Sequence, residues 1–159
     1  MNNVEIMTQA GYDKLKQKLI SASADRDEAL SAIAESKKQG GELSENSEFI
    51  EAKDRFDKIE IRMKSINDRL MSAKIMDIST IIEGGKIRFG SHVKLVDLDN
   101  ENELHYQILG EEEADIKNGI ISYKSPIAKA MIGKEVGDQV YFVTPSGERE
   151  LEVLKIGLD

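Results

Sequence analysis

The chain has no cysteine, no tryptophan and only two prolines among its 159 residues. Without cysteine it can form neither a disulfide framework nor a thiolate-ligated zinc site. No apolar run approaches the roughly 18 residues that a membrane-spanning helix needs. The first residues also lack the basic start and apolar core of a signal peptide. We therefore expect a cytoplasmic protein.

Aromatic residues are scarce as well, at 5% of the chain, although 40% of the residues are hydrophobic. That hydrophobic content is sufficient for a folded protein, and the length predicts one or two small domains. The low aromatic content suits a coiled coil joined to a small second domain.

The chain has fewer basic than acidic residues, which gives a net charge of −8, and this excess of acidic residues is unevenly distributed along the sequence. Residues 1–75 carry 13 Lys and Arg against 14 Asp and Glu, whereas the remainder carries 9 against 16. Affinity for nucleic acid comes largely from neutralising phosphates. We therefore expect any contact with nucleic acid to be local or made within a larger assembly.

The first half contains two helical stretches in which apolar residues recur every three or four positions. Folding the chain back between Glu42 and Leu43 pairs each seam position with one whose number brings the sum to 85. This register predicts two antiparallel helices of about 27 residues, each about 40 Å long, packed as a coiled coil. The sixteen seam positions are Tyr12, Leu15, Leu19, Ala22, Arg26, Ala29, Ile33, Ser36, Phe49, Ala52, Phe56, Ile59, Met63, Ile66, Leu70 and Ala73.

Helix-boundary residues are also recognisable. Thr8 is predicted to cap the first helix and Ser44 the second. Gly40 or Gly41 is predicted to end the first helix in the left-handed conformation. The polar seam residue Arg26 faces Ile59, and we expect its guanidinium either to reach Asp57 or Glu60 or to fix the register.

Acidic residues gather at the tip of this hairpin, which we define as residues 40–48. If Ser44 caps the helix, Glu45 and Glu48 occupy its first turn, where they complement the helix dipole and need no further role. However, Glu45 also continues the seam and would face Gly40, at a position where packing would favour leucine. Together with Glu42 it offers half of a site for a hard cation such as Mg²⁺. Beside the tip, Lys37 and Lys53 lie at similar heights and could grip one phosphate, although a solvated face explains them equally well.

The second half changes to strand-like alternation. Strands are predicted at 91–98, 103–109, 119–123, 139–144 and 149–156, with turns at 84–85, 99–102 and 145–148. Ser125 and Pro126 should open a short helix that runs to Gly133. The expected class is therefore α+β, with an antiparallel helical hairpin followed by a mainly antiparallel sheet and one short helix. The predicted boundaries are 1–76 for the hairpin, 77–83 for a linker and 84–159 for the sheet domain. We expect no metal or catalytic role for His92 or His105.

The motif at residues 41–49, which overlaps the tip, and the segment 121–134 together resemble the Gre family of bacterial transcript-cleavage factors, and the resemblance covers essentially the whole chain. The family tip usually reads Gly-Asp-Leu-Ser/Lys-Glu-Asn, whereas this chain has an extra glycine and Glu42 in place of the aspartate. The resemblance implies an FKBP-like sheet domain. It also implies a partner, the bacterial RNA polymerase, whose secondary channel would admit the hairpin.

The resemblance further implies a function and a set of site residues. The protein would stimulate cleavage of the 3′ end of backtracked nascent RNA, as a cofactor of the polymerase and not as an enzyme. Glu42 and Glu45 would be the catalytic carboxylates, holding a second Mg²⁺ jointly with the polymerase. Lys37 and Lys53 would contact the RNA. Docking on the polymerase would involve Ser125, Pro126, Ile127 and Met131.

Two other functions fit parts of the pattern. The altered tip also suits a channel-binding inhibitor that does not provoke cleavage. An FKBP-like domain suggests a prolyl isomerase or chaperone, but its aromatic residues are too few and too scattered for the usual aromatic-lined pocket. Because the seam is satisfied within one chain, we expect a monomer.

Overall fold

The computed structural model describes residues 4–81 and 85–158. The chain divides into two compact units, one containing residues 12–73 and the other residues 5–11 and 74–159. The sequence-based boundaries place residues 5–11 with the hairpin, whereas these residues cluster with the sheet. Residues 82–84, which include the end of the predicted linker and Gly84 of the predicted turn, lie outside the described residues. Within those residues, no helix has the length and apolar character needed to cross a membrane.

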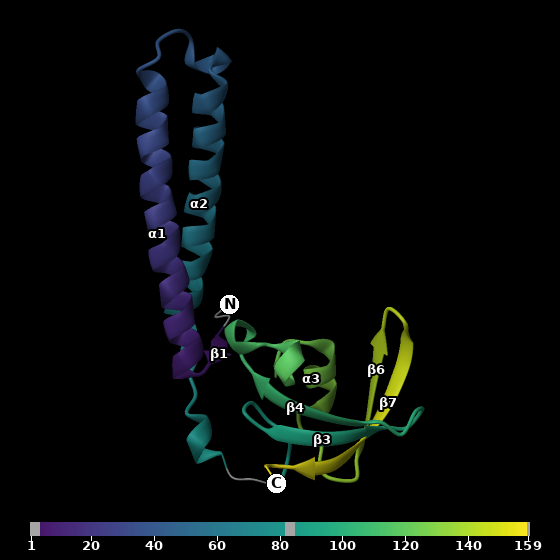
Figure 1. The fold of residues 1–159 in the computed structure, drawn as a ribbon. Coiled ribbons are helices and arrows are strands. Elements are labelled where there is room, and N and C mark those ends of the chain that lie inside the picture. Colours follow the sequence, from purple (N-terminus) through teal and green to yellow (C-terminus); the bar gives the residue numbers. More distant parts are fainter. Residues whose placement is uncertain (1–3, 82–84, 159) are drawn as a thin grey trace. The chain divides into compact units, whose positions relative to one another are not determined.

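The first unit is a hairpin of α1 (Gln9–Lys37) and α2 (Ser47–Met71), which lie side by side in Figure 1. Thr8 caps α1, since its Oγ1 accepts a hydrogen bond from the Gly11 N–H at 3.3 Å. All sixteen predicted seam positions are buried or half-buried. The prediction of a helical hairpin is therefore confirmed.

Along the seam, the more deeply buried residue of each facing pair comes alternately from α1 and from α2, except that Tyr12 and Ala73 are both half-buried. Ala22 and Ala29 are buried and pack with the larger, half-buried Met63 and Phe56, which are their partners in the predicted register. Arg26 lies between them, and its Nη1 is 3.2 Å from Glu60 Oε1. The structure thus confirms that this guanidinium reaches Glu60, while its stem remains in the seam beside buried Ile59.

The second unit is built on a curled five-stranded sheet with the order β5-β4-β3-β7-β6 (Figure 1). Its strands are β3 (His92–Asp97), β4 (Glu103–Leu109), β5 (Ile120–Ser122), β6 (Gln139–Thr144) and β7 (Gly147–Ile156). A short helix, α3 (Pro126–Met131), packs on one face. The core between them contains Val93, Leu95, Ile108, Ala128, Met131, Val140, Leu151 and Val153, all buried. The predicted α+β class is confirmed.

One strand pair differs from the antiparallel sheet expected from the sequence. β5 runs parallel to β4, with Ile108 paired to Ile121. The segment between them folds into two short 3-10 turns, Glu111–Glu113 and Ile116–Asn118. These turns bring the chain back so that β5 can run beside β4 in the same direction. A parallel pair needs such a crossover and cannot be joined by a tight turn.

Two short strands were missed by the sequence analysis. β1 (Glu5–Met7) and β2 (Ala73–Ile75) form a separate two-stranded sheet. The main-chain N–H of Met76 donates to the Met7 carbonyl oxygen at 2.8 Å. A 3-10 turn, Ile78–Thr80, follows, and Asp77 caps it by accepting from the Ser79 N–H at 3.0 Å. These hydrogen bonds with the Ser79 side chain and backbone lower the pKa of Asp77.

Candidate functional site

The tip of the hairpin begins with an abrupt end to α1. The N–H groups of Lys38 and Gln39 donate to the carbonyls three residues earlier, at 3.2 and 3.3 Å, which tightens the last turn. Gly40 and Gly41 then both adopt left-handed backbone conformations, with φ of 76° and 83°. The structure confirms the predicted glycine termination and shows that both glycines take part.

Asn46, and not Ser44 as predicted, caps α2. Its Oδ1 accepts a hydrogen bond from the Phe49 N–H at 3.1 Å. Its Nδ2 donates to the carbonyl oxygen of Ser36 at 3.0 Å, in the last part of α1. Serine lacks a planar amide with a donor and an acceptor on separate atoms, so it could not bridge the two helices in this way. Asn46 therefore links the end of α1 to the beginning of α2.

The change of cap moves Glu45 out of the helix. Glu42 immediately precedes the 3-10 turn Leu43–Glu45, and Glu45 is the last residue of that turn. The Glu45 N–H donates to the Glu42 carbonyl oxygen at 3.1 Å. Both side chains are exposed. The expectation that Glu45 continues the seam and faces Gly40 is wrong, because the chain enters the helix only at Ser47. The two carboxylates are nevertheless held within one turn.

The third acidic residue at the tip has a different role. Glu48 lies in the first turn of α2, and its Oε2 accepts a hydrogen bond from Gln39 Nε2 at 2.8 Å. It complements the helix dipole and ties the helix to the end of α1. By contrast, no hydrogen bond or ion pair engages the side chains of Glu42 and Glu45 within the described part of the chain.

The donor set at the tip fits part of a magnesium site. Carboxylate oxygens are suitable ligands, and Mg²⁺ commonly takes one or two carboxylates together with water and phosphate oxygens. Residues 4–81 and 85–158 contain no cluster of three or more side chains placed to hold a metal ion. Glu42 and Glu45 could therefore share an ion with another molecule that supplies further ligands.

The two predicted RNA-contacting lysines are both exposed near the tip but have different neighbours. Lys37 Nζ lies 5.9 Å from the centre of the Phe49 ring, within cation–π range. Lys53 Nζ lies 3.4 Å from Asp57, one helical turn further along α2. The Lys53 amine pairs with Asp57 and the Lys37 amine lies by Phe49, so the structure does not show the two amines placed to bind one phosphate together.

The predicted docking residues lie at the start and end of α3. Ser125 Oγ accepts from the Ala128 N–H at 3.3 Å, and Pro126 occupies the first turn, as predicted. Pro126 is exposed, and Ile127 is half-buried against the core. Met131, however, has 0% of its surface exposed. Its assignment as a docking contact is corrected, since its side chain belongs to the core beneath the helix.

Comparisons with known proteins identify the family to which the chain belongs. The family described as "Transcription elongation factor, N-terminal" matches residues 5–75, and "Transcription elongation factor, GreA/GreB, C-term" matches residues 82–157. The transcription elongation factor GreA of Thioalkalivibrio sulfidiphilus is 44% identical over 94% of this chain and 95% of its own length. GreA of Caulobacter sp. strain K31 is 43% identical over the same shares. The chain belongs to the GreA/GreB family of transcription elongation factors.

Solved structures of related proteins were also found. The GreA factor homolog 1 (Gfh1) of Thermus thermophilus is 31% identical, covering 98% of this chain and all of its own, with a TM-score of 0.44. The Gfh1 of Thermus aquaticus is likewise 31% identical, with a TM-score of 0.45.

Asn46 is the tip residue that the sequence analysis missed. An available signal was the spacing of Asn46 three residues before Phe49, the first apolar seam residue of α2. Asparagine ranks at least equal to serine as a helix cap. Choosing between Ser44 and Asn46 nevertheless required the hydrogen bond to Ser36, which spans ten residues of chain.

Proposed function

We propose that the protein is a transcript-cleavage factor that acts on bacterial RNA polymerase. Its hairpin would enter the secondary channel and stimulate endonucleolytic cleavage at the 3′ end of backtracked nascent RNA. Family membership supports the elongation-factor role. The protein would be a cofactor of the polymerase's own activity, because its tip offers too few ligands for a complete active site.

The observation that carries this proposal is the pairing of Glu42 and Glu45 in one exposed turn. The Glu45 N–H to Glu42 carbonyl bond fixes their backbones relative to each other. Neither carboxylate is engaged by the described part of the chain, so both remain available as ligands. A second Mg²⁺, shared with the polymerase, would activate water and stabilise the leaving oxygen. The protein's contribution is thus to present two carboxylates in a fixed turn.

Other parts of the chain would position the tip. Lys37 and Lys53 would contact RNA phosphates, each as a single positive charge. The start of α3, with exposed Pro126 and half-buried Ser125 and Ile127, would dock on the polymerase. The protein would act in the cytoplasm. It would act as a monomer, because the apolar seam is already buried or half-buried within one chain.

A channel-binding inhibitor is the second candidate, and the glycines favour it. Two consecutive left-handed residues, Gly40 and Gly41, precede the carboxylates, where the usual family tip has one glycine. This insertion changes the path of the chain into Glu42. If it displaces the carboxylates from the polymerase's own metal, the hairpin would occupy the channel without provoking cleavage.

RNA cleavage in a defined backtracked complex tests both candidates. A complex with labelled RNA would be incubated with the protein, with the Glu42→Ala/Glu45→Ala double variant, or with Glu28→Ala as a matched control on α1. We expect the parent and the control to release 3′ fragments and the double variant to release none. Raising Mg²⁺ should partly rescue the single variants Glu42→Ala and Glu45→Ala, tested in the same assay, since a lost ligand weakens ion binding without removing the polymerase's own site.

Three results would change this conclusion. Slowed elongation without cleavage by the parent would establish the inhibitor. Equal cleavage by the parent and the double variant would mean that the carboxylates are not ligands. A protein that neither cleaves nor slows the polymerase would refute both candidates.

A further inference from the structure

Strand β6 forms one edge of the five-stranded sheet, since among the described residues it pairs with β7 alone (Figure 1). Natural sheets usually protect an exposed edge with a charged residue, a proline, a bulge or a very short strand. The opposite edge, β5, has only three residues. β6 has six, reads Gln-Val-Tyr-Phe-Val-Thr without charge or proline, and pairs with β7 in an unbroken register. It is therefore an unprotected edge.

The backbone of β6 can accept a further strand. In an antiparallel pair, alternate residues direct their N–H and C=O groups toward the neighbouring strand, and the others direct them away. Within residues 4–81 and 85–158, the backbone hydrogen bonds of β6 are made to β7. The outward-facing groups are thus available for strand addition, a common mode of peptide recognition.

Three side chains of β6 point away from the core, and each lies directly opposite a glutamate of β7. The three pairs are Gln139 with Glu152, Tyr141 with Glu150, and Val143 with Glu148. Side chains directly opposite each other share one face of the sheet, with Cβ atoms about 5 Å apart. The intervening Val140 is buried in the core, so the pairs lie on the outer face. Tyr141 and Val143 are 50% and 64% exposed.

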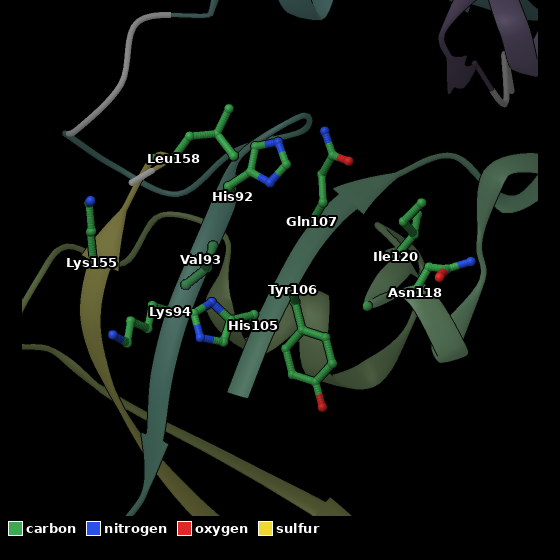
Figure 2. Close-up of a pocket in the computed structure, with 12 residues that line it drawn as sticks. His92, Val93, Lys94, His105, Tyr106, Gln107, Asn118, Ile120, Lys155 and Leu158 are labelled. Carbon is green, nitrogen blue, oxygen red and sulfur yellow. The ribbon is translucent and has the colours of Figure 1, made fainter. Parts of the chain in front are cut away.

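The same outer face continues onto β3 and β4, where charges are matched. Lys94 on β3 (Figure 2) places its Nζ 3.3 Å from Glu103 Oε2 on β4. On β7, Arg149 lies between two glutamates in sequence but points to the opposite face, where it binds Asp97. Positive charge is therefore paired elsewhere in the sheet and not beside the glutamates of β7.

Glu148 and Glu150 are exposed, and no ion pair engages either one within the part of the chain that the structure describes. The Tyr141 hydroxyl donates a hydrogen bond to Glu148. This hydrogen bond, together with partial burial and the charges of Glu148 and Glu150, raises the pKa of Tyr141. The β6 edge thus borders a surface that is acidic and aromatic, which suits a basic partner.

We propose that β6 binds an extended segment of a partner protein that adds a sixth strand and carries lysine or arginine at alternate positions. The basic side chains lie on the outer face beside Tyr141 and Val143. Neighbouring strands are about 4.8 Å apart, so these long side chains can reach toward the glutamates of β7. Arginine also gains a cation–π contact with the Tyr141 ring. The intervening side chains of the segment point inward beside half-buried Phe142, which favours apolar residues there.

Charge also selects against a second copy of this chain. If two β6 edges paired, each would bring its own row of glutamates toward the other, and like charges would face each other across the interface. The β6 surface is separate from the start of α3, and the proposal does not rest on the transcript-cleavage function.

The test is a titration of the full-length protein with two blocked peptides of equal composition, followed by backbone amide NMR at constant ionic strength. One peptide alternates arginine and valine, and the other has a run of arginines before a run of valines. We expect the alternating peptide to give saturable shifts at residues 139–144 and to slow hydrogen exchange at the outward-facing amides of β6. The block-ordered peptide should bind more weakly, because it cannot place all its basic side chains on one face.

Glutamate variants test the charge complementarity. Glu148→Gln and Glu150→Gln should each weaken binding of the alternating peptide about two- to fivefold, the effect of one exposed ion pair. Glu28→Gln, which removes the same charge on α1, should leave binding unchanged.

Val143 tests the edge itself. Val143→Lys adds the kind of charge that protects natural edge strands, beside the basic side chains of the added strand, and should weaken binding at least about fivefold. Val143→Thr keeps an uncharged, β-branched side chain and should bind within about twofold of the parent. The amide spectra report whether each variant folds.

Four results would overturn the proposal. Equal affinity for the two peptides would show charge attraction without strand addition. Parent-like binding by a Glu148→Gln/Glu150→Gln double variant would remove the role of charge. Shifts that do not saturate, or that lie outside β6 and β7, would place no strand at this edge. A dimer of the free parent in analytical ultracentrifugation that dissociates in Val143→Lys would assign the edge to a second copy of this chain.

Discussion

Arg149 on β7 donates a hydrogen bond from Nη2 to Oδ2 of Asp97, a fully buried carboxylate at the end of β3. The other oxygen of Asp97 accepts from the Asp99 N–H at 2.9 Å. These contacts lower the pKa of Asp97, the backbone hydrogen bond from Asp99 contributing most and the Arg149 guanidinium next. A buried charge is therefore compensated at the turn that joins β3 to β4.

The first prediction concerns the pH dependence of stability. Because the pKa of Asp97 in the folded protein lies below its ordinary value of 3.8, the ionised form stabilises the fold above that value. This contribution is lost as the pH falls through the folded pKa. We expect the free energy of unfolding, measured in urea between pH 5 and pH 2.5, to fall less steeply for Asp97→Asn than for the parent. The exposed turn variant Glu101→Gln should keep the parent's slope, and identical slopes for parent and Asp97→Asn would contradict the assignment.

The second prediction tests the register of the hairpin. Cysteines at Leu19 and Ile66 should form an intrachain disulfide rapidly, since these positions face each other across the seam. The chain has no other cysteine to compete. Cysteines at Leu19 and Leu70, one turn away, should react much more slowly. Mobility on a non-reducing gel distinguishes the two, and a faster Leu19–Leu70 pair would mean that the register is shifted by one turn.

Much of the hairpin could be predicted from the sequence because its information is local and repeated. Sixteen seam positions with a period of three or four residues specify both helices and their pairing. The short strands β1 and β2 carry no such pattern. Each has three residues, and each forms only because it meets the other from more than sixty residues away.

The site could be predicted less completely. Composition and spacing identified Glu42 and Glu45, but not the turn that holds them. That turn depends on Asn46 reaching back to Ser36, a tertiary contact. Similarly, the apolar Met131 reads equally well as a surface anchor or a core residue until the sheet that covers it is known.

The third prediction concerns Asn46. Asn46→Ala removes both the helix cap and the bond to Ser36, and should lower the free energy of unfolding by about 1.5–3 kcal/mol. Asn46→Ser keeps an acceptor for the Phe49 N–H but loses the bridge to α1, so its loss should be about half as large. Urea unfolding measures both. A serine variant as stable as the parent would show that the bridge to Ser36 contributes nothing.

The fourth prediction tests whether Lys37 and Lys53 act on the RNA or in docking on the polymerase. If Lys37 and Lys53 contact RNA phosphates as proposed, Lys37→Ala and Lys53→Ala should each reduce cleavage of backtracked RNA about three- to tenfold, because each removes one positive charge. Polymerase affinity, measured by competition with the labelled parent, should change little. Lys18→Ala on α1 serves as the matched control. A parallel loss of polymerase affinity in both the Lys37→Ala and the Lys53→Ala variants would assign these lysines to docking instead.

The position of β7 has a consequence for the order in which the protein folds during synthesis. β7 lies between β3 and β6, yet its pairs with β3 run from Asp97–Leu151 to Val93–Ile156, which are 54 to 63 residues apart in the chain. Until residues through Ile156 have emerged from the ribosome, β3 lacks one neighbour and the core beneath α3 stays open. The hairpin, by contrast, has all of its pairing residues by Ala73. We therefore expect a nascent chain to carry a finished hairpin joined to an unfinished sheet, exposing the apolar face of β3 and β4 to chaperones until its final strand arrives.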